Sequence, residues 1–225
     1  MDDKALENEI EFQRLQSLFF KIIAELVEFR DIDTGGHIER TQNYLGSLLG
    51  ALIRNNIYRQ EIDTWDLKLV ISSSQLHDIG KIAVRDCILQ KPGKLTDQEF
   101  EEMKEHTVQG VKIIEKIMGN LVRKSFLETA KILAGTHHEK WDGSGYPEGL
   151  KGEEIPLLGR LMAIADVYDA LVSERPYKKP FTHKKAVEIT KEGRGTHFDP
   201  VLVDIFLETA DEFNEIATAR NNNKS

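Results

Sequence analysis

The sequence has a single cysteine, Cys87, among its 225 residues. No cysteine pair is therefore present to form a disulfide, and a reducing, cytoplasmic location is expected. No run of about 18 apolar residues occurs, so no membrane span is predicted. The chain opens with acidic and polar residues instead of a basic stretch followed by an apolar one, which predicts no signal peptide.

Basic residues are outnumbered by acidic ones, 30 against 38, which gives a formal net charge of −8. Binding to the backbone of a nucleic-acid polymer needs basic patches, so this balance argues against such a partner. A small anionic ligand is compatible with it, provided that metal ions and a few Lys or Arg side chains make the site locally positive. Hydrophobic residues make up 40% of the chain, enough to bury a core.

Convincing strand patterns are also missing, and apolar residues recur at helical spacing instead. The sequence predicts an all-α fold, a single domain of seven or eight helices. A long glycine-rich loop is expected between His138 and Pro156, and a second loop between Ile82 and Leu95. The expected helices span residues 3–30, 37–55, 65–78, 97–114, 121–136, 157–173, 183–192 and 200–217.

Capping residues mark several of the expected helix starts. Asp63-Thr64 are predicted to cap the helix that ends at His77-Asp78. Thr96 and Glu99 have the spacing of a capping box. Thr182 precedes another helix, and Asp199-Pro200 has the order of a cap followed by proline.

The expected N-terminal helix is amphipathic. Its apolar residues are Leu6, Ile10, Leu15, Leu18, Ile22, Leu26 and Phe29. The second half is predicted to pack on the core. Two interpretations stay open for the charged first half: a connection to an upstream receiver or sensor domain, or one helix of a coiled-coil homodimer. The expected division is residues 1–20 as this connecting helix, 21–218 as the main domain and 219–225 as a disordered tail.

The segment from Gln75 to Lys81 is the one around which the site is expected to form. His77 and Asp78 follow an apolar run and precede Gly80, where a helix would stop. Two ligand-type side chains at a helix end can turn toward one spot, and a carboxylate can bridge two metal ions through its two oxygens. Such a pair alone is more often a polar helix cap, so its importance depends on the other histidines.

Further His and Asp side chains lie at expected helix ends or in apolar helix faces. Asp166 is the carboxylate predicted to be buried, and a buried charge needs a partner. Nitrogen and oxygen ligands suit Fe, Mn, Zn, Co or Ni, of which Fe or Mn is expected here. So many ligands exceed the needs of one ion and indicate two ions bridged by Asp78, or three, an arrangement that cleaves phosphate esters. The candidate ligands are His37, His77, Asp78, His106, His137, His138 and Asp166, with Asp33 four residues before the first histidine.

Three motifs carry a resemblance to a known family: His77-Asp-Ile-Gly-Lys81, then His106, then His137-His-Glu-Lys-Trp-Asp-Gly-Ser-Gly-Tyr-Pro147. The chain resembles the HD-GYP family over about residues 20–210, and the Asp-Gly-x-Gly-Tyr-Pro loop distinguishes this branch from other HD hydrolases. The resemblance implies an all-α HD-type domain. It also implies a bacterial, metal-dependent phosphodiesterase that hydrolyses cyclic di-GMP in second-messenger signalling.

The resemblance implies the metal ligands given above. Asp33 stands where some members carry the longer Glu for a third ion. Lys81 is implied to lie beside the scissile phosphate, for charge stabilisation or protonation of the leaving group, with Asp78 as the other catalytic residue. The Arg-Pro-Tyr-Lys turn is implied to bind the phosphates of the ligand through Arg175 and Lys178. The residues expected to shape the loop around the substrate are Gly143, Gly145 and Tyr146.

The expected product is linear pGpG, with a second cut to GMP left open. Three other interpretations are compatible with the residues. The domain could bind cyclic di-GMP as a receptor without hydrolysing it, or it could be an HD phosphohydrolase that acts on another cyclic dinucleotide or nucleotide. It could also be a helical scaffold with incidental histidines, which would bind no metal.

Overall fold

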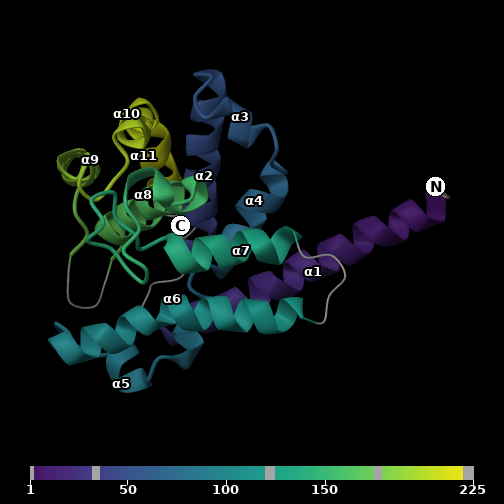
Figure 1. Ribbon diagram of the computed structural model, residues 1–225, viewed down its shortest axis with the longest axis horizontal. Coiled ribbons are helices and arrows are strands. Elements are labelled where there is room, and N and C mark those ends of the chain that lie inside the picture. The colour runs from purple at the N-terminus through teal and green to yellow at the C-terminus, as the bar shows by residue number, and fades with distance from the viewer. Residues whose placement is uncertain (1–2, 32–35, 120–124, 175–178, 220–225) are drawn as a thin grey trace.

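The computed structural model describes residues 3–31, 36–119, 125–174 and 179–219 (Figure 1). Within these ranges the chain forms eleven α-helices, three short 3₁₀-helices and no strand, which confirms the all-α prediction. The α-helices are α1 (Asp3–Arg30), α2 (His37–Arg54), α3 (Arg59–Ile62), α4 (Leu67–Ser73), α5 (Asp86–Leu89), α6 (Asp97–Met118), α7 (Ser125–Thr136), α8 (Leu157–Val172), α9 (His183–Glu192), α10 (Pro200–Glu208) and α11 (Ala210–Thr218). The 3₁₀-helices are Ser74–Leu76, Ile79–Ala83 and Gly152–Glu154.

The described helices outnumber the seven or eight that the sequence predicted. Helices α3 and α5 have four residues each, about one turn, which is too short to display a 3.6-residue period. The presence of α5 makes the prediction of a continuous loop from Ile82 to Leu95 wrong. The expected helix over residues 200–217 is divided into α10 and α11 at Thr209, where φ is −100° and ψ is 9°.

Helix α4 begins after Asp66, so the predicted cap at Asp63-Thr64 is wrong. The Asp66 carboxylate accepts a hydrogen bond of 3.1 Å from the Leu69 backbone N–H. The Thr64 hydroxyl donates instead to the Glu61 carbonyl at the end of α3, a helix that the sequence did not reveal. The other predicted caps are confirmed at Thr96, Thr182 and Asp199.

The main core lies around α2 and α8, with α10 and α11 packed beside them (Figure 1). The ring of Tyr44 stacks on Phe213 at a centroid distance of 4.5 Å, and both side chains are fully buried. A second core forms under the inner face of α1, where Phe20 stacks on Phe126 of α7. The second half of α1 therefore packs on the core, as predicted. No helix in the described ranges combines the length and apolar character needed to cross a membrane.

Helix α6 packs against α7 and against the 3₁₀-helix Ile79–Ala83. The contact at Gly80 is so close that a Cβ atom there would lie 1.8 Å from the backbone oxygen of His106. Any other residue would push the 3₁₀-helix away from α6. Gly80 thus brings the His77-Asp78 step against the helix that carries His106, and this packing positions the site.

Candidate metal centre

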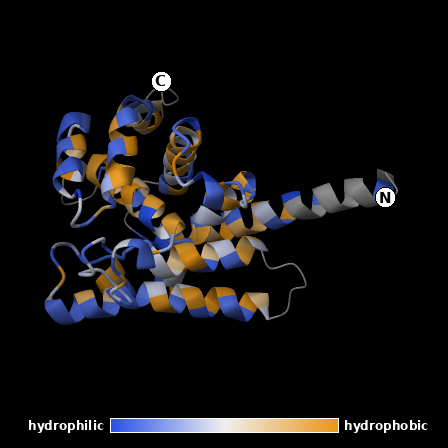
Figure 2. Cartoon of the chain, turned by 45° about the horizontal axis from the view of Figure 1, so that its top comes forward, coloured by the Kyte–Doolittle hydropathy of each residue, from blue (hydrophilic) through white to orange (hydrophobic). Residues whose placement is uncertain are grey.

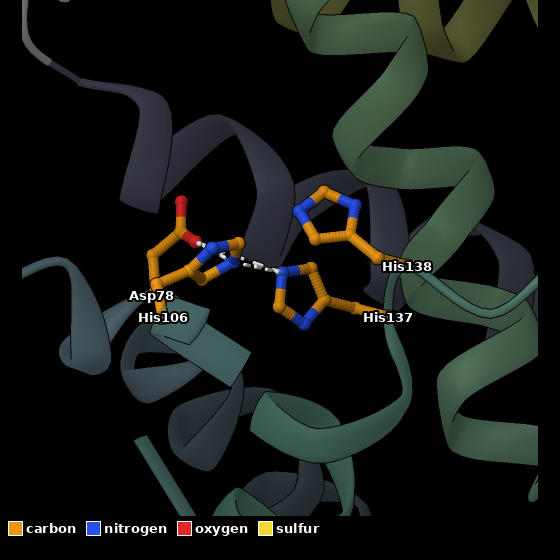
Figure 3. A group of neighbouring side chains, drawn as sticks. All are labelled: Asp78, His106, His137 and His138. Carbon is orange, nitrogen blue, oxygen red and sulfur yellow. Dashed lines mark hydrogen bonds and ion pairs between the residues drawn. The ribbon is translucent and has the colours of Figure 1, made fainter. Parts of the chain in front are cut away.

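Four of the predicted ligands meet in one group, called here the first cluster: Asp78, His106, His137 and His138 (Figure 3). Each offers one ligand atom, and these atoms all lie within 4.8 Å of one another. The Nε2 atoms of His106 and His137 lie 3.3 Å and 3.6 Å from Asp78 Oδ1. Helix α6, the end of α7 and the turn before Gly80 therefore contribute to one site.

Three others form the second cluster: His37, His77 and Asp166, again with ligand atoms within 4.8 Å of one another. His37 Nε2 lies 3.3 Å from His77 Nε2 and 3.6 Å from Asp166 Oδ1. The two clusters are joined by Asp78, because its Oδ2 atom lies 3.4 Å from His77 Nε2 while its Oδ1 atom faces the first cluster. One carboxylate thus presents an oxygen to each cluster.

The tautomers of four histidines follow from their Nδ1 contacts. Each Nδ1–H donates to an oxygen: His77 to Ser74 O at 2.9 Å, His106 to Met103 O at 2.7 Å, His137 to Leu133 O at 2.9 Å, and His37 to Asp169 Oδ2 at 2.8 Å. The Nε2 atom of each ring is therefore left with its lone pair toward the cluster. An imidazole oriented by its second nitrogen in this way is the usual arrangement at a metal ion.

The residues fit divalent cations for three reasons. In the first cluster the Nε2 atoms of His106 and His137 face each other at 3.4 Å, although neither has a hydrogen to donate in these tautomers. Asp78 Oδ1 is buried and has no hydrogen-bond partner, which is costly for an ionised oxygen. Burial lowers the pKa of His77 and of His106 to about 4, so both rings are neutral at pH 7.

Acidic groups surround His37. Burial by itself would lower the pKa of this ring, but the hydrogen bond to Asp169 and the nearby charges of Asp166 and Asp169 outweigh it and raise the pKa to about 9. The ring therefore favours a positive charge at Nε2. A metal ion would supply that charge in place of a proton, since a ligating imidazole must be neutral.

The prediction that Asp166 is the buried carboxylate of α8 is wrong. Asp166 is only partly buried, whereas Asp169, one turn later, is fully buried. Asp169 accepts hydrogen bonds from His37 and from Arg40, the latter at 2.6 Å and 2.8 Å. Burial alone would raise the pKa of Asp169, but these bonds lower it to about 2. Asp169 thus orients His37 without belonging to either cluster.

Lys81 lies directly beside the clusters. Its ammonium group is 2.8 Å from Asp78 Oδ2 and 2.7 Å from Asp31 Oδ2, at the end of α1. Burial by itself would lower the pKa of Lys81, but the two carboxylates reverse this effect and raise it. Asp31 was missed by the sequence analysis, because nothing local indicates that the end of α1 reaches residue 81.

The glycine-rich loop covers the first cluster. The ring of Tyr146 lies 4.8 Å from His138, and a Cβ at Gly145 would come within 2.3 Å of the Lys140 backbone nitrogen. Gly143 has a φ of 85°, which favours glycine. The carboxylate of Glu139, also missed by the sequence analysis, is buried and accepts hydrogen bonds from the backbone N–H groups of residues 148–150. These bonds keep the loop folded beside the histidines.

The remaining predicted site residues, Asp33, Arg175 and Lys178, lie outside the described residues, as does the predicted tail from residue 220. The predicted division of the chain at residue 20 stays a prediction, and α1 runs through this position without a break. His197, outside both clusters, has its ring stacked on Phe198 at 4.2 Å.

A family model for the HD domain matches residues 29–202. The chain belongs to the HD domain family. The resemblance to its HD-GYP branch, read from the motifs, is confirmed. HD domain phosphohydrolases are metal-dependent, and the two clusters of this member have the composition to bind metal.

Two curated relatives come from Vibrio cholerae. A protein named cyclic di-GMP phosphodiesterase is 47% identical over 95% of this chain and 43% of its own length. Another, named 3′3′-cGAMP-specific phosphodiesterase 2, is 43% identical over 85% of this chain and 34% of its own length. The chain thus spans less than half the length of these relatives. A crystal structure of a cyclic GMP-AMP specific phosphodiesterase from V. cholerae shares the fold, with a TM-score of 0.56 and 18% identity over 87% of this chain and 50% of that one.

Proposed function

We propose that this chain is a metal-dependent phosphodiesterase that hydrolyses cyclic di-GMP to linear pGpG, with a second cut to GMP open to it. The observation that carries the proposal is the position of Asp78, whose two oxygens face two separate groups of imidazoles. A carboxylate between two histidine clusters suits a pair of bridged cations. The 47% identical relative, whose name states this activity, supports the choice of substrate.

The proposed ligands are those of the two clusters. Two bound ions would activate a water and neutralise negative charge on the phosphate. Nitrogen and oxygen donors without thiolate suit Fe or Mn, which we propose as the metals. A third ion would need Asp33, which stands four residues before His37 in the sequence.

Lys81 is proposed to stabilise charge on the phosphate under attack. Its ammonium lies 2.8 Å from the bridging Asp78, so it borders the position where a phosphate held between the clusters would sit. Two neighbouring carboxylates raise the pKa of Lys81 and keep it charged. This supports a role in electrostatic stabilisation over donation of its proton to the leaving 3′ oxygen.

The substrate contacts are proposed on two segments. Gly143, Gly145 and Tyr146 belong to the loop beside His138, where a nucleotide bound at the first cluster would lie. Arg175 and Lys178 are proposed to bind the phosphates because they match the Arg-Pro-Tyr-Lys motif of the family. The predicted cytoplasmic location and the upstream receiver or sensor domain remain predictions.

The test is turnover of cyclic di-GMP by protein loaded anaerobically with Fe(II) or Mn(II), with products separated and metal counted in the same sample. We expect linear pGpG, about two metal ions per chain, and no product from the His77→Ala variant. Tight binding of cyclic di-GMP to metal-loaded protein without product would contradict hydrolysis and support a receptor. If the wild-type protein bound no metal, the proposal that the two clusters are metal sites would be wrong.

A second candidate substrate is 3′3′-cGAMP, because the 43% identical relative is named for that specificity. The two substrates share the cyclic phosphodiester ring and differ in one base. Rates measured side by side on both cyclic dinucleotides separate the candidates. A kcat/KM for 3′3′-cGAMP above that for cyclic di-GMP would replace the first proposal with the second.

A further inference from the structure

We propose that Phe100 and Lys104 of α6, together with Tyr146 of the glycine-rich loop, form the subsite for one guanine base of the substrate. The inference rests on the proposed function and deepens it, because it assigns a base of the cyclic dinucleotide to a place on the protein. Neither Phe100 nor Lys104 belongs to the two clusters. Both candidate substrates, cyclic di-GMP and 3′3′-cGAMP, contain guanine, so the subsite serves either of them.

Phe100 is a large aromatic side chain at an exposed position. It lies near the start of α6 and is 45% exposed, although the first turns of this helix are otherwise mostly hydrophilic (Figure 2). A phenyl ring gains free energy by leaving water, so an exposed one is available to a flat apolar ligand. A single exposed apolar residue needs no explanation by itself, and it is the surroundings of Phe100 that point to a ligand.

A row of rings leads from the first cluster to Phe100. The ring centroid of Tyr146 lies 4.8 Å from that of His138 and 6.2 Å from that of Phe100. The planes of Tyr146 and Phe100 are nearly perpendicular, at 85°, so the two rings form a corner. In a nucleotide the base is one sugar away from its phosphate. A phosphate held at the clusters therefore brings its base toward this corner.

Lys104 supplies a polar contact at the same place. Its Nζ atom lies 5.1 Å from the centroid of the Phe100 ring and 5.6 Å from that of Tyr146. The ammonium pairs with the exposed carboxylate of Glu101 at 2.6 Å. Since an ammonium has three N–H donors, this ion pair leaves others for a ligand.

A cation beside two aromatic rings favours guanine over adenine. Stacking on an aromatic ring is tolerant of sequence, because every base has a π-face. Guanine presents two neighbouring acceptors, O6 and N7, to a lysine, whereas adenine has an amino donor in place of O6. The rings of Phe100 and Tyr146 thus supply affinity for a base, and Lys104 supplies the selection of guanine.

The first test separates base stacking from apolar packing at Phe100. Phe100→Ala and Phe100→Leu should each raise KM for cyclic di-GMP about tenfold or more, because both remove the aromatic face. Phe100→Tyr should retain the wild-type KM. The matched control is Val201→Ala, another exposed apolar position, on α10. Metal content should be unchanged throughout. A wild-type KM in Phe100→Ala would overturn the subsite, and so would one in Phe100→Leu, since apolar packing would then suffice.

The second test measures selectivity through kcat/KM for cyclic di-GMP and for cyclic di-AMP. Lys104→Met removes the charge with little change in length, and we expect it to lower kcat/KM for cyclic di-GMP about tenfold or more without a matching fall for cyclic di-AMP. Lys112→Met, at an exposed position of the same helix, is the matched control. An unchanged value for cyclic di-GMP, or an equal fall for both substrates, would overturn the role of Lys104.

Binding measurements distinguish failure of the subsite from failure of the proposed function. Calorimetric titration with a phosphorothioate analogue of cyclic di-GMP, which resists hydrolysis, gives Kd for the metal-loaded wild type and for each variant. A wild type that binds the analogue but never releases product would overturn hydrolysis, and a weaker Kd of Phe100→Ala would still support the subsite. Turnover by the wild type with the same KM and Kd in all variants would overturn the subsite alone. A wild type without affinity for the analogue would overturn both.

Discussion

The two ligand clusters differ in what holds their histidines in place. In the first cluster, His106 and His137 donate Nδ1–H to backbone carbonyls three and four residues earlier in their own helices. In the second cluster, His77 likewise donates to a backbone carbonyl three residues earlier, but His37 donates to the side chain of Asp169, which lies 132 residues away on α8. The first cluster is therefore oriented mainly by local helix geometry. The second depends on the packing of α2 against α8 and on one charged side chain.

Removing the residue that joins the clusters should have the largest effect. We expect Asp78→Ala to lower turnover by about 1,000-fold or more and to reduce bound metal at both clusters, because each loses an oxygen ligand. Helicity should persist, since Asp78 belongs to neither hydrophobic core. Metal analysis, turnover and circular dichroism check this, with Asp211→Ala, an exposed position of α11, as the control. Near-wild-type turnover of Asp78→Ala would refute the bridging role.

Removing a ligand from one cluster at a time should separate the two. His138→Ala affects the first cluster and Asp166→Ala the second. We expect each variant to keep about one metal ion per chain and to lose about 100-fold or more in turnover, because two ions act together on one phosphate. Elemental analysis after desalting provides the count. If either variant retained the full metal content and rate, its cluster would not be a metal site.

The hydrogen bond between His37 and Asp169 provides a sharper test of the difference between the two clusters. Asp169→Asn removes the charge that orients this ring, and we expect the affinity of the second cluster for Mn(II) to fall by about 10- to 100-fold. The first cluster should keep its affinity, since its Nδ1 partners are backbone carbonyls. Titration with Mn(II), followed by electron paramagnetic resonance, resolves the two affinities. Equal weakening of both clusters would mean that the substitution acts through general unfolding.

A smaller effect is expected at Asp31, which we predict to position Lys81. Asp31→Asn should lower kcat by about tenfold with the metal content intact, because Lys81 would lose one of the two carboxylates that fix its ammonium. Asp86→Asn is the matched control, since that carboxylate pairs with Arg30 in the same region without contacting Lys81. The measurement is kcat and the metal content of both variants. An unchanged kcat for Asp31→Asn contradicts the positioning role.

The smallest effect concerns His197, outside both clusters. Burial lowers its pKa to about 4, against about 6.5 in the unfolded chain. Between pH 6.5 and 4 the unfolded state binds a proton that the folded state does not, so the free energy of unfolding falls as the pH falls through this range. At pH 5 the loss attributable to this residue is about 2 kcal/mol.

His197→Phe should therefore lose less stability than the wild type between pH 7 and pH 5. Urea unfolding of both proteins at the two pH values measures the difference. The other buried histidines contribute equally to both proteins and cancel in the comparison. Identical pH dependence of the two proteins would show that His197 is not protonated differently in the folded and unfolded states.

The sequence contained enough information for the fold class and the members of both clusters. The apolar period located the long helices, and the same residue types at helix ends indicated metal ligands. Helices α3 and α5 were missed because one turn carries no detectable period. The cap of α4 was misplaced for the same reason, since Thr64 belongs to the end of α3.

The sequence could not predict which of the two carboxylates on α8, Asp166 or Asp169, is buried and orients His37. The two carboxylates lie three residues apart on α8, so both face the same side of the helix, and helical spacing cannot rank their burial. Only the packing of α2 places His37 and Arg40 against Asp169. Likewise, the pairing of Asp31 with Lys81 joins residues 50 positions apart.

By itself, the sequence determined which residue types can bind metal, where the long helices form and which motif links the chain to its family. Those properties depend on local spacing and on the chemistry of single side chains. The tertiary structure decided how seven candidate ligands divide into two clusters, which oxygen of Asp78 faces each, and which partner orients His37. These depend on distances between helices remote in sequence, which are set by core packing and by close contacts such as that of Gly80 with α6.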